Sequence, residues 1–411
     1  MWTMVEKVVL LICDGLGDRP IDELGALTPL EAAETPCLDR LARESECGLM
    51  YPLGRGLVPG SDVAHLAILG YDPQEYYAGR GTIEAAGLGI LLRPGDVALR
   101  GNFATVDGGG IVRDRRAGRI RVVEPLVKPL DGIELDGVTF MVKAGTAHRA
   151  VVVMRGEGLS ASVTDADPHK AAARLGRVSP RDNTPEARRT ADVLNRFIDR
   201  ASAILHDHPL NIERRRDGHA EANYLLLRGA GHYREVPSFR ERYGLSACCI
   251  AGGGMYKGIG RYLGMTVLEV PGATGLPDSD VPAKFRAALR SLETFDFVFV
   301  HVKATDSFGE DGDFIGKKTF IETIDRAARV FESLPANTLF VMTGDHSTPC
   351  ALREHSADPV PIMLRGSGVR VDDVVAFGER ACARGGLGTL SGTNVMHHVL
   401  NILGRLPLAG A

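Results

Sequence analysis

The chain has 411 residues, of which 44% are hydrophobic and 24% are charged, and this balance excludes a disordered or fibrous protein. Its length exceeds one typical hydrophobic core and predicts two domains. Forty-eight basic and 52 acidic side chains give a net charge of −4, which excludes the overall basic character of a nucleic-acid-binding protein.

Cysteine usage and hydropathy restrict the class further. The seven cysteines form no Cys-x-x-Cys pair, so neither a disulfide framework nor a zinc site is indicated, and we expect a reducing, cytoplasmic location. The longest apolar run near the N-terminus, residues 8–13, is far shorter than the roughly 20 residues of a membrane span. We therefore expect a soluble protein without a membrane partner.

Strands and helices alternate over much of the chain. Thr35 is expected to cap one helix and Asp280 another. A third helix, between residues 320 and 334, is amphipathic. Four continuously apolar stretches read as parallel strands buried on both faces: residues 8–12, 297–300, 339–342 and 361–364. This alternation predicts an α/β fold with a parallel sheet sandwiched by helices.

The middle of the chain, residues 76–245, has a different character. It is rich in glycine and arginine, with short alternating strands such as 150–154 and one long amphipathic helix near 187–206. The charged run 213–217 is expected to be a solvated loop. We interpret this stretch as a smaller α/β domain inserted into a first domain, which comprises residues 1–75 and 246–411.

Acidic and histidine side chains follow the predicted strands. Asp14 follows the first strand, Asp306 the second and Asp345-His346 the third, and His355 lies in the next loop. Each alone is explained as a turn or cap residue. Together they should meet at the carboxyl edge of the sheet, where clustered carboxylates repel one another unless a cation neutralises them. Two divalent ions about 3.5–4 Å apart would do so and would clamp a phosphoryl group.

Ser61 is a candidate nucleophile. It follows Pro59-Gly60 and precedes an apolar helical pattern, so its hydroxyl should lie at a helix N-terminus. There it either caps the helix or attacks a phosphate that the helix N-terminus stabilises. His65 and His301 are expected to pack or to support ligands.

The predicted insert carries candidate substrate contacts. Five arginines lie within nine residues: Arg113, Arg115, Arg116, Arg119 and Arg121. They form either a solvated hairpin or a surface for a small anionic substrate, because guanidinium groups match carboxylate and phosphate geometry. His148 and Lys257, the latter in a glycine-rich loop outside the insert, are further candidates. Asp165 and Asp167 are candidate acid–base groups, although a turn before Pro168 explains either equally.

Seven motifs, in this order along nearly the whole chain, resemble the archaeal-type cofactor-independent phosphoglycerate mutases of the alkaline phosphatase superfamily. They are Cys13-Asp14-Gly15, Pro59-Gly60-Ser61-Asp62, Leu69-Gly70-Tyr71-Asp72-Pro73, Gly79-Arg80-Gly81, Asp114-Arg115-Arg116-Ala117-Gly118-Arg119, Gly254-Met255-Tyr256-Lys257-Gly258 and Gly344-Asp345-His346-Ser347-Thr348-Pro349. The resemblance implies an alkaline-phosphatase-like metal-binding domain with an inserted phosphotransferase domain. It also implies two divalent metal ions, with Mn²⁺ favoured and Mg²⁺, Co²⁺ or Zn²⁺ as alternatives. The implied reaction interconverts 3-phosphoglycerate and 2-phosphoglycerate through a phosphorylated Ser61.

The same resemblance implies the ligand sets. One metal site would comprise Asp14, Ser61, Asp345 and His346, and the other Asp306 and His355. A loose correspondence also implies that Asp165 or Asp167 moves protons between substrate hydroxyls.

One position departs from the family pattern. Where the family has Asp-x-x-Gly-His, this chain has Asp306-Ser307-Phe308-Gly309-Glu310. Glu310 either ligates a hard cation through its carboxylate, or the site acts on another small phospho- or phosphono-substrate. A related phosphatase or phosphotransferase, and a metal-poor protein that only binds ligands, remain alternatives. The oligomeric state stays open.

Overall fold

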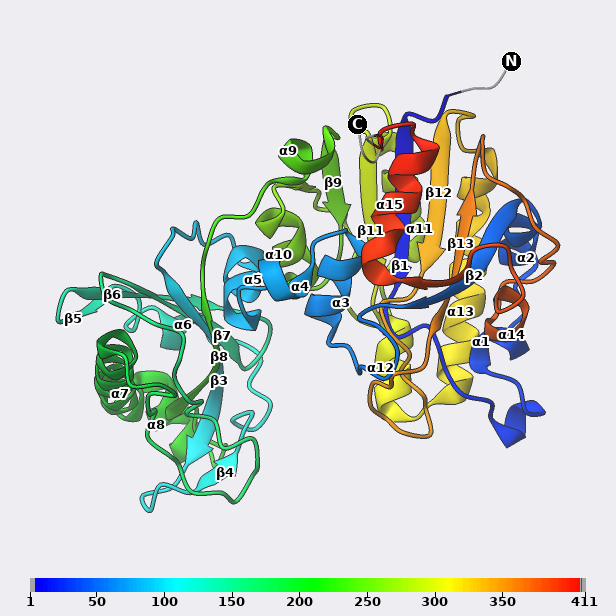
Figure 1. Cartoon of the computed structure of the whole chain (residues 1–411). Coiled ribbons are helices and arrows are strands. Elements are labelled where there is room, and N and C mark those ends of the chain that lie inside the picture. Colours follow the sequence, from blue (N-terminus) through cyan, green and yellow to red (C-terminus); the bar gives the residue numbers. More distant parts are fainter. Residues whose placement is uncertain (1–3, 407, 409–411) are drawn as a thin grey trace. The chain divides into compact units, whose positions relative to one another are not determined.

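Eight strands form the main sheet of the structure, a computed structural model that describes residues 4–406 and 408 (Figure 1). In spatial order they are β10 (Thr266–Val267), β9 (Ala247–Ile250), β11 (Phe297–Val302), β1 (Lys7–Cys13), β12 (Thr338–Thr343), β13 (Val360–Arg365), β2 (Ser45–Tyr51) and β14 (Gly388–Ser391). Neighbouring strands are parallel except at β13, which is antiparallel to both β12 and β2. The predicted strands are present, and the parallel sheet is confirmed for three of them.

The direction of β13 corrects the sequence prediction for residues 361–364. A parallel return requires a crossover connection, usually a helix. The segment between β12 and β13 instead forms turns and an irregular loop that carries Asp345, His346 and His355. The chain therefore re-enters the sheet antiparallel, with Val341 opposite Leu364.

Helices cover both faces of this sheet. Val9 and Leu11 of β1 belong to a core shared with α2 (Pro36–Arg43), α11 (Val281–Ser291) and α13 (Phe314–Ala328). The intervening Val8 and Leu10 are equally buried on the other face, as expected for a strand with two covered sides. Figure 1 shows α15 (Gly392–Ile402) over the sheet, and α3 (Ser61–Ile68) packs against both α15 and α10 (Gly254–Tyr262). The sandwiched α/β architecture is confirmed.

Within residues 4–406, four further helices of this unit have eight residues or more. They are α3 (Ser61–Ile68), α10 (Gly254–Tyr262), α12 (Ala304–Asp311) and α15 (Gly392–Ile402). The short elements are α1 (Pro29–Ala32), α4 (Pro73–Tyr76), α9 (Phe239–Tyr243), α14 (Glu379–Cys382) and 3₁₀ turns at Asp22–Leu24 and Arg329–Ser333. In the described part of the chain, no helix has both the length and the apolar character that a membrane crossing requires.

The two helix caps predicted from the sequence have different outcomes. Asp280 caps α11, because its carboxylate accepts from the Ala283 amide at 2.8 Å. Thr35 precedes α2 as predicted, but its side chain makes no cap bond. Instead Asp325 of α13 accepts from the amides of Cys37 and Leu38, at 2.9 and 2.8 Å. The cap of α2 therefore comes from a distant part of the sequence.

A second compact unit spans Ala78–Val236, and the first consists of the chain before and after it. Its sheet is antiparallel, in the order β4 (Val112–Asp114), β3 (Val97–Val106), β7 (Arg149–Arg155), β6 (Val138–Ala144) and β5 (Ile133–Leu135), with β8 (Tyr224–His232) also paired to β3. The division at Val236 precedes the predicted boundary at residue 245, so α9 belongs to the first unit. Residues 1–3, 407 and 409–411 of the predicted first domain lie outside the described residues.

The second unit has helices on both faces of its sheet. The long helix α7 (Pro185–His206), predicted near 187–206, packs Phe197 against Phe140 of β6, with stacked rings 4.1 Å apart. On the other side α5 (Arg80–Gly87) packs Ala85 against Ala98 and Val151. The remaining helices are α6 (Glu124–Val127) and α8 (Pro209–Arg216). The loop predicted at 213–217 is wrong in its first part, because α8 extends to Arg216 and its arginines lie at the helix end that favours positive charge.

Candidate active site

The carboxyl edge of β1, β11 and β12 collects the acidic and histidine side chains that follow these strands. Two groups of ligand atoms form there, each with its atoms within 4.8 Å of one another. One group is Asp14, Asp345 and His346, and the other is Asp306, His346 and His355. All are buried except His355, which is partly exposed. The five residues predicted to meet at this edge are therefore brought together.

Ser61 lies beside both groups at the start of α3. The N-cap of α3 is Gly60, whose position has no side-chain cap, so Ser61 is the first helical residue rather than the cap. Its Oγ lies 3.1 Å from Nε2 of His346. The helix therefore presents this hydroxyl at its N-terminal end, where its backbone favours an anion.

Thr348 fixes the orientation of His346. Its hydroxyl has one proton, which it donates to Oδ1 of Asp306 at 2.6 Å. The same oxygen lies 3.0 Å from His346 Nδ1 and therefore accepts the proton of that nitrogen. The lone pair of His346 is then on Nε2, which is 3.4 Å from Asp14 Oδ1 and 3.3 Å from Asp345 Oδ2.

His355 has a comparable arrangement. Its Nδ1 lies 2.8 Å from the Pro59 carbonyl oxygen, which can only accept, so Nδ1 carries a proton. Its Nε2 faces Asp306 Oδ1 at 3.5 Å. Burial opposes the charged imidazolium, but the Asp306 carboxylate and the Pro59 carbonyl outweigh it and raise the pKa of His355. The surroundings of His355 therefore favour a positive charge, either a proton on His355 or a cation between His355 and Asp306.

The residues at this edge fit divalent cations. Asp14 Oδ1 and Asp345 Oδ2 are buried and have no hydrogen-bond partner among the described residues. A buried carboxylate oxygen without a partner is costly unless a cation neutralises it. Carboxylate oxygens suit ions such as Mn²⁺ or Mg²⁺, and imidazole nitrogens suit Zn²⁺. This donor set does not select a single metal.

The carboxylates perturb one another strongly. Burial and the Asp14 charge raise the pKa of Asp345 well above its usual value. For Asp14, burial is outweighed by Lys303 and His301, which hold its pKa well below the usual value. For Asp306, burial and Asp14 are outweighed by His355 and Lys303, and its pKa is lowered to about 2. Such crowding is what a bound cation would relieve.

Lys303 is the residue of this site that sequence reasoning missed. Its Nζ lies 3.4 Å from Asp14 Oδ2 and pairs with Asp306 Oδ2, so it contacts a carboxylate of each group. Burial is outweighed by these two carboxylates, which raise the pKa of Lys303 and keep it charged. The available signal was its position directly after an apolar strand and one helical turn before Asp306.

Other predicted residues of the first unit lie outside the two groups. Lys257 on α10 pairs with Glu269, with Nζ and Oε2 2.5 Å apart. His65 is buried and donates to the Ser61 carbonyl oxygen at 2.7 Å, and burial lowers its pKa. It therefore supports the start of α3, as expected for a packing residue.

The predicted residues of the second unit divide into two sets. Arg115 forms a two-point ion pair with the buried Asp167, at 3.2 and 2.6 Å. Asp165 lies 3.0 Å from His169 Nε2 and accepts from the Gly229 amide at 2.8 Å. Apart from this cluster, Arg113 pairs with Asp107, whereas Arg116, Arg119 and Arg121 are exposed.

Two further arginines of the second unit were not predicted from the sequence as candidate site residues, because they lie in strands. Arg100 of β3 is directly opposite Arg228 of β8. Arg228 Nε lies 3.7 Å from Asp167, and Arg100 pairs with Glu84 of α5 at 3.4 Å. Half-buried His148 has its pKa lowered to about 4 by burial and by nearby arginines. Strand alternation could have placed Arg100 and Arg228 on one face, but not beside each other.

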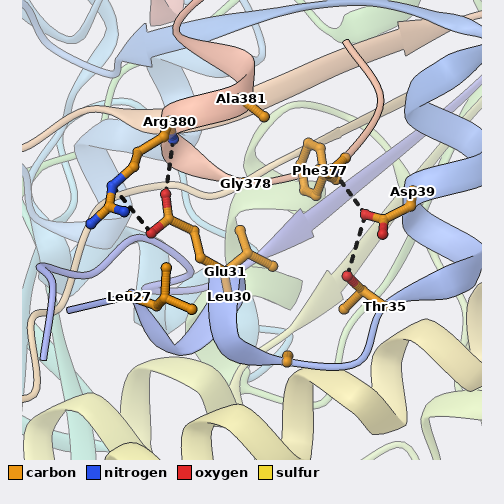
Figure 2. A pocket seen from close by; sticks show the side chains of 11 residues that line it. Leu27, Leu30, Glu31, Thr35, Asp39, Phe377, Gly378, Arg380 and Ala381 are labelled. Carbon is orange, nitrogen blue, oxygen red and sulfur yellow. Dashed lines mark hydrogen bonds and ion pairs between the residues drawn. The ribbon is translucent and has the colours of Figure 1, made fainter. Parts of the chain in front are cut away.

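A separate cavity of about 220 Å³ contains none of these residues (Figure 2). It lies between α1, the start of α2 and the segment that leads into α14. Its polar lining is already paired: the Arg380 amide donates to Glu31, and Asp39 accepts from Thr35 and from the Phe377 amide. It therefore offers no comparable set of unpaired donors or acceptors among the residues that line it.

Comparison with known proteins agrees with this geometry. The family model for 2,3-bisphosphoglycerate-independent phosphoglycerate mutase matches residues 42–211. A protein of that name from Methanocaldococcus jannaschii is 46% identical over 98% of this chain and 99% of its own length. One from Archaeoglobus fulgidus is also 46% identical, over 98% of this chain and all of its own length. The chain belongs to the 2,3-bisphosphoglycerate-independent phosphoglycerate mutase family.

Solved structures support the same assignment over the whole fold. A cofactor-independent phosphoglycerate mutase from Thermoplasma acidophilum is 37% identical, with a TM-score of 0.74, covering 97% of this chain and all of its own. A protein from Pyrococcus horikoshii is 36% identical, with a TM-score of 0.86, covering 99% and 100%. The resemblance to this mutase family that the seven motifs indicated is therefore confirmed.

Glu310 is the position at which the sequence was expected to depart from the family pattern. It lies on α12 one turn after Asp306, is exposed, and belongs to neither group of ligand atoms. Desolvation and the Asp306 charge raise its pKa. Its carboxylate is therefore close enough for the Asp306 charge to shift its pKa, although it is not part of either group.

Proposed function

We propose that this chain interconverts 3-phosphoglycerate and 2-phosphoglycerate by metal-dependent phosphoryl transfer through a phosphorylated Ser61. The observation that carries the proposal is the Ser61 hydroxyl, 3.1 Å from His346 Nε2 and beside two groups of ligand atoms that are buried except for His355. The names of the relatives support the substrate. The partner is accordingly a small phosphorylated acid.

The residues that would hold two divalent ions follow from the two groups. Asp14, Ser61, Asp345 and His346 would hold one, and Asp306 and His355 the other, with Glu310 as an added oxygen ligand after a rotamer change. Bound ions would act as Lewis acids on the phosphoryl oxygens and orient them for in-line attack. Mn²⁺ is the proposed ion, with Mg²⁺, Co²⁺ or Zn²⁺ as alternatives that the same donors accept.

The reaction consists of two in-line transfers. Ser61 loses its proton as its Oγ forms a bond to phosphorus, the bond between phosphorus and the substrate oxygen breaks, and that oxygen takes up a proton. The other hydroxyl of glycerate then loses a proton and attacks the phosphoserine, and the released Ser61 oxygen takes up a proton. Lys303 neutralises charge on the transferred group, and the N-terminus of α3 stabilises it. Two inversions give net retention at phosphorus.

The second unit supplies the groups that act on the glycerate part. Asp167 is committed to Arg115, and burial is outweighed by that arginine, so its pKa is lowered. Asp165, partly exposed and in contact with His169, is the better proton carrier. Arg113, Arg115, Arg116, Arg119, His148 and, in the first unit, Lys257 are proposed to bind the substrate anion.

The location follows from the cysteines. All seven are unpaired and buried. This pattern supports the cytoplasm, where thiols stay reduced.

The test is phosphorus NMR of the purified protein with 3-phosphoglycerate and Mn²⁺. Formation of 2-phosphoglycerate is expected, and Ser61→Ala should lower the rate by at least about 10³-fold, because the nucleophile is lost. Ser291→Ala is the matched control, since this hydroxyl donates to the Ala287 carbonyl within α11 and Ser291 belongs to neither group of ligand atoms. Absence of product in metal-loaded protein, or full activity of Ser61→Ala, would contradict the proposal.

A further inference from the structure

Asp14 is held in the site through only one of its two carboxylate oxygens. Oδ2 accepts from the Tyr256 hydroxyl and from His301 Nε2, the latter at 3.1 Å, and Lys303 Nζ lies 3.4 Å from the same oxygen. Oδ1 is buried, has no hydrogen-bond partner in the described part of the chain, and faces His346 Nε2 at 3.4 Å. The fixed oxygen and the free oxygen of this carboxylate are therefore clearly distinguished.

Tyr256 and His301 come from different elements but form one rigid pair. Tyr256 lies in the first turn of α10 and His301 in β11, and their rings stack with centroids 3.4 Å apart and planes at 19°. Both side chains are buried. A Cβ on Gly253 would lie 2.8 Å from the Tyr256 ring, so the glycine leaves room for it. Tyr256 and His301 therefore cannot move independently of each other.

Hydrogen bonding determines the tautomer of His301, that is, which ring nitrogen carries the proton. Its Nδ1 is buried and has no partner among residues 4–406, whereas Nε2 faces a carboxylate oxygen. A proton on Nδ1 would leave a buried donor unpaired and place the Nε2 lone pair against Asp14, which is unfavourable on both counts. The imidazole therefore carries its proton on Nε2 and donates it to Asp14.

We propose that Tyr256 and His301 are positioning residues that anchor Oδ2 of Asp14 and so present Oδ1 to a divalent cation. The inference rests on the proposed function, because it assumes that Asp14 is a metal ligand. Groups that orient a ligand typically change metal affinity by 10–100-fold when they are removed. Neither residue needs to touch the substrate or the ion.

The test is Mn²⁺ binding to chelator-treated full-length protein, measured from the electron paramagnetic resonance signal of free Mn²⁺. Tyr256→Phe keeps the stacked ring and removes only the donor, and we expect one class of sites to weaken about 10–100-fold. Tyr262→Phe is the matched control on the same helix, because this hydroxyl donates to the Tyr76 carbonyl at 3.0 Å. It should leave Mn²⁺ affinity unchanged.

A second pair of variants separates positioning from packing. His301→Leu removes the donor, whereas His301→Gln places an amide N–H near the position of Nε2 and should restore most of the affinity. Equal affinity in wild type, Tyr256→Phe and His301→Leu would overturn the inference and leave the proposed function intact. Equal loss in Tyr256→Phe and Tyr262→Phe, or no rescue by His301→Gln, would also overturn it. Failure of the wild type to bind Mn²⁺ would overturn both proposals.

Discussion

Thr348 links the two groups of ligand atoms through a single hydroxyl. It donates to Asp306 and accepts from His346 Nδ1, so it sets which nitrogen of His346 faces Ser61. Thr348→Val keeps the shape but removes this link, and we expect activity and Mn²⁺ affinity to fall about 10–100-fold. Thr348→Ser keeps the hydroxyl and should stay near wild type in both assays. Equal activity of the valine and serine variants would contradict this role.

At the scale of single residues, the sequence predicts which acidic and histidine side chains meet better than it predicts the residues that contact them. Asp14, Asp345 and His346 follow apolar strands directly, and the carboxyl ends of parallel strands share one edge. Lys303 and Thr348 lie equally near in the sequence, but their roles depend on side-chain distances of 2.6–3.4 Å that no periodicity encodes. Even a correct register would not have distinguished Lys303 from a solvated lysine.

At the scale of elements, the N-terminus of α2 shows how a local signal can mislead. Asp325→Ala removes the acceptor of two amide groups and should lower the free energy of unfolding by about 2–3 kcal/mol, because these are charge-assisted bonds. Thr35→Ala should cost less, about 1 kcal/mol, since that side chain makes no cap bond and the variant loses its hydrogen bond to Asp39. Urea unfolding of the two variants measures the difference. The reverse ranking would restore Thr35 as the cap.

The start of α14 carries a pH-dependent contribution to stability. Glu379 accepts from the Thr28 hydroxyl at 2.8 Å and from the Asp18 amide at 3.2 Å, yet burial, with the nearby Glu31, raises its pKa to about 7. The fold thus favours the protonated carboxyl. Its stabilisation is fully present below the usual pKa of a glutamate and is lost as pH rises through about 7.

Glu379→Gln should remove this dependence. We expect the variant to lose less stability than wild type between pH 5 and pH 8, by about 1–3 kcal/mol, which is a few degrees in Tm. Glu293→Gln, an exposed position at the end of α11, is the control and should follow wild type. Thermal unfolding at the two pH values checks both. Parallel curves for Glu379→Gln and wild type would show that Glu379 is ionised throughout.

At the scale of the whole molecule, the sequence predicts the α/β class and an inserted second unit because both depend on patterns of many residues. The helix α7 and the strands of the main sheet are examples, since each buries a continuous apolar face. The direction of β13 could not be read from its own residues, because it depends on the loop that precedes it. The cluster of Arg115, Asp167 and Arg228 likewise requires segments that only the folded sheet brings together.

The two units also divide the proposed reaction between them, which gives a test of the whole molecule. Every residue proposed to phosphorylate Ser61 lies in the first unit, whereas Asp165, the proposed proton carrier, lies in the second. The alcohols of glycerate are poor leaving groups and need a proton. Nitrophenolate leaves without one. A substrate such as p-nitrophenyl phosphate should therefore require the first unit's residues but not Asp165.

Asp165→Asn keeps an oxygen that can accept from the Gly229 amide but cannot move a proton. We expect mutase activity to fall about 10²–10⁴-fold, the usual contribution of general acid–base catalysis, with hydrolysis of p-nitrophenyl phosphate within about twofold of wild type. Ser61→Ala should lose both activities. Asp167→Asn weakens the ion pair with Arg115 and should mainly lower stability. A parallel loss of both activities in a folded Asp165→Asn variant would mean that the second unit also takes part in phosphorylating Ser61.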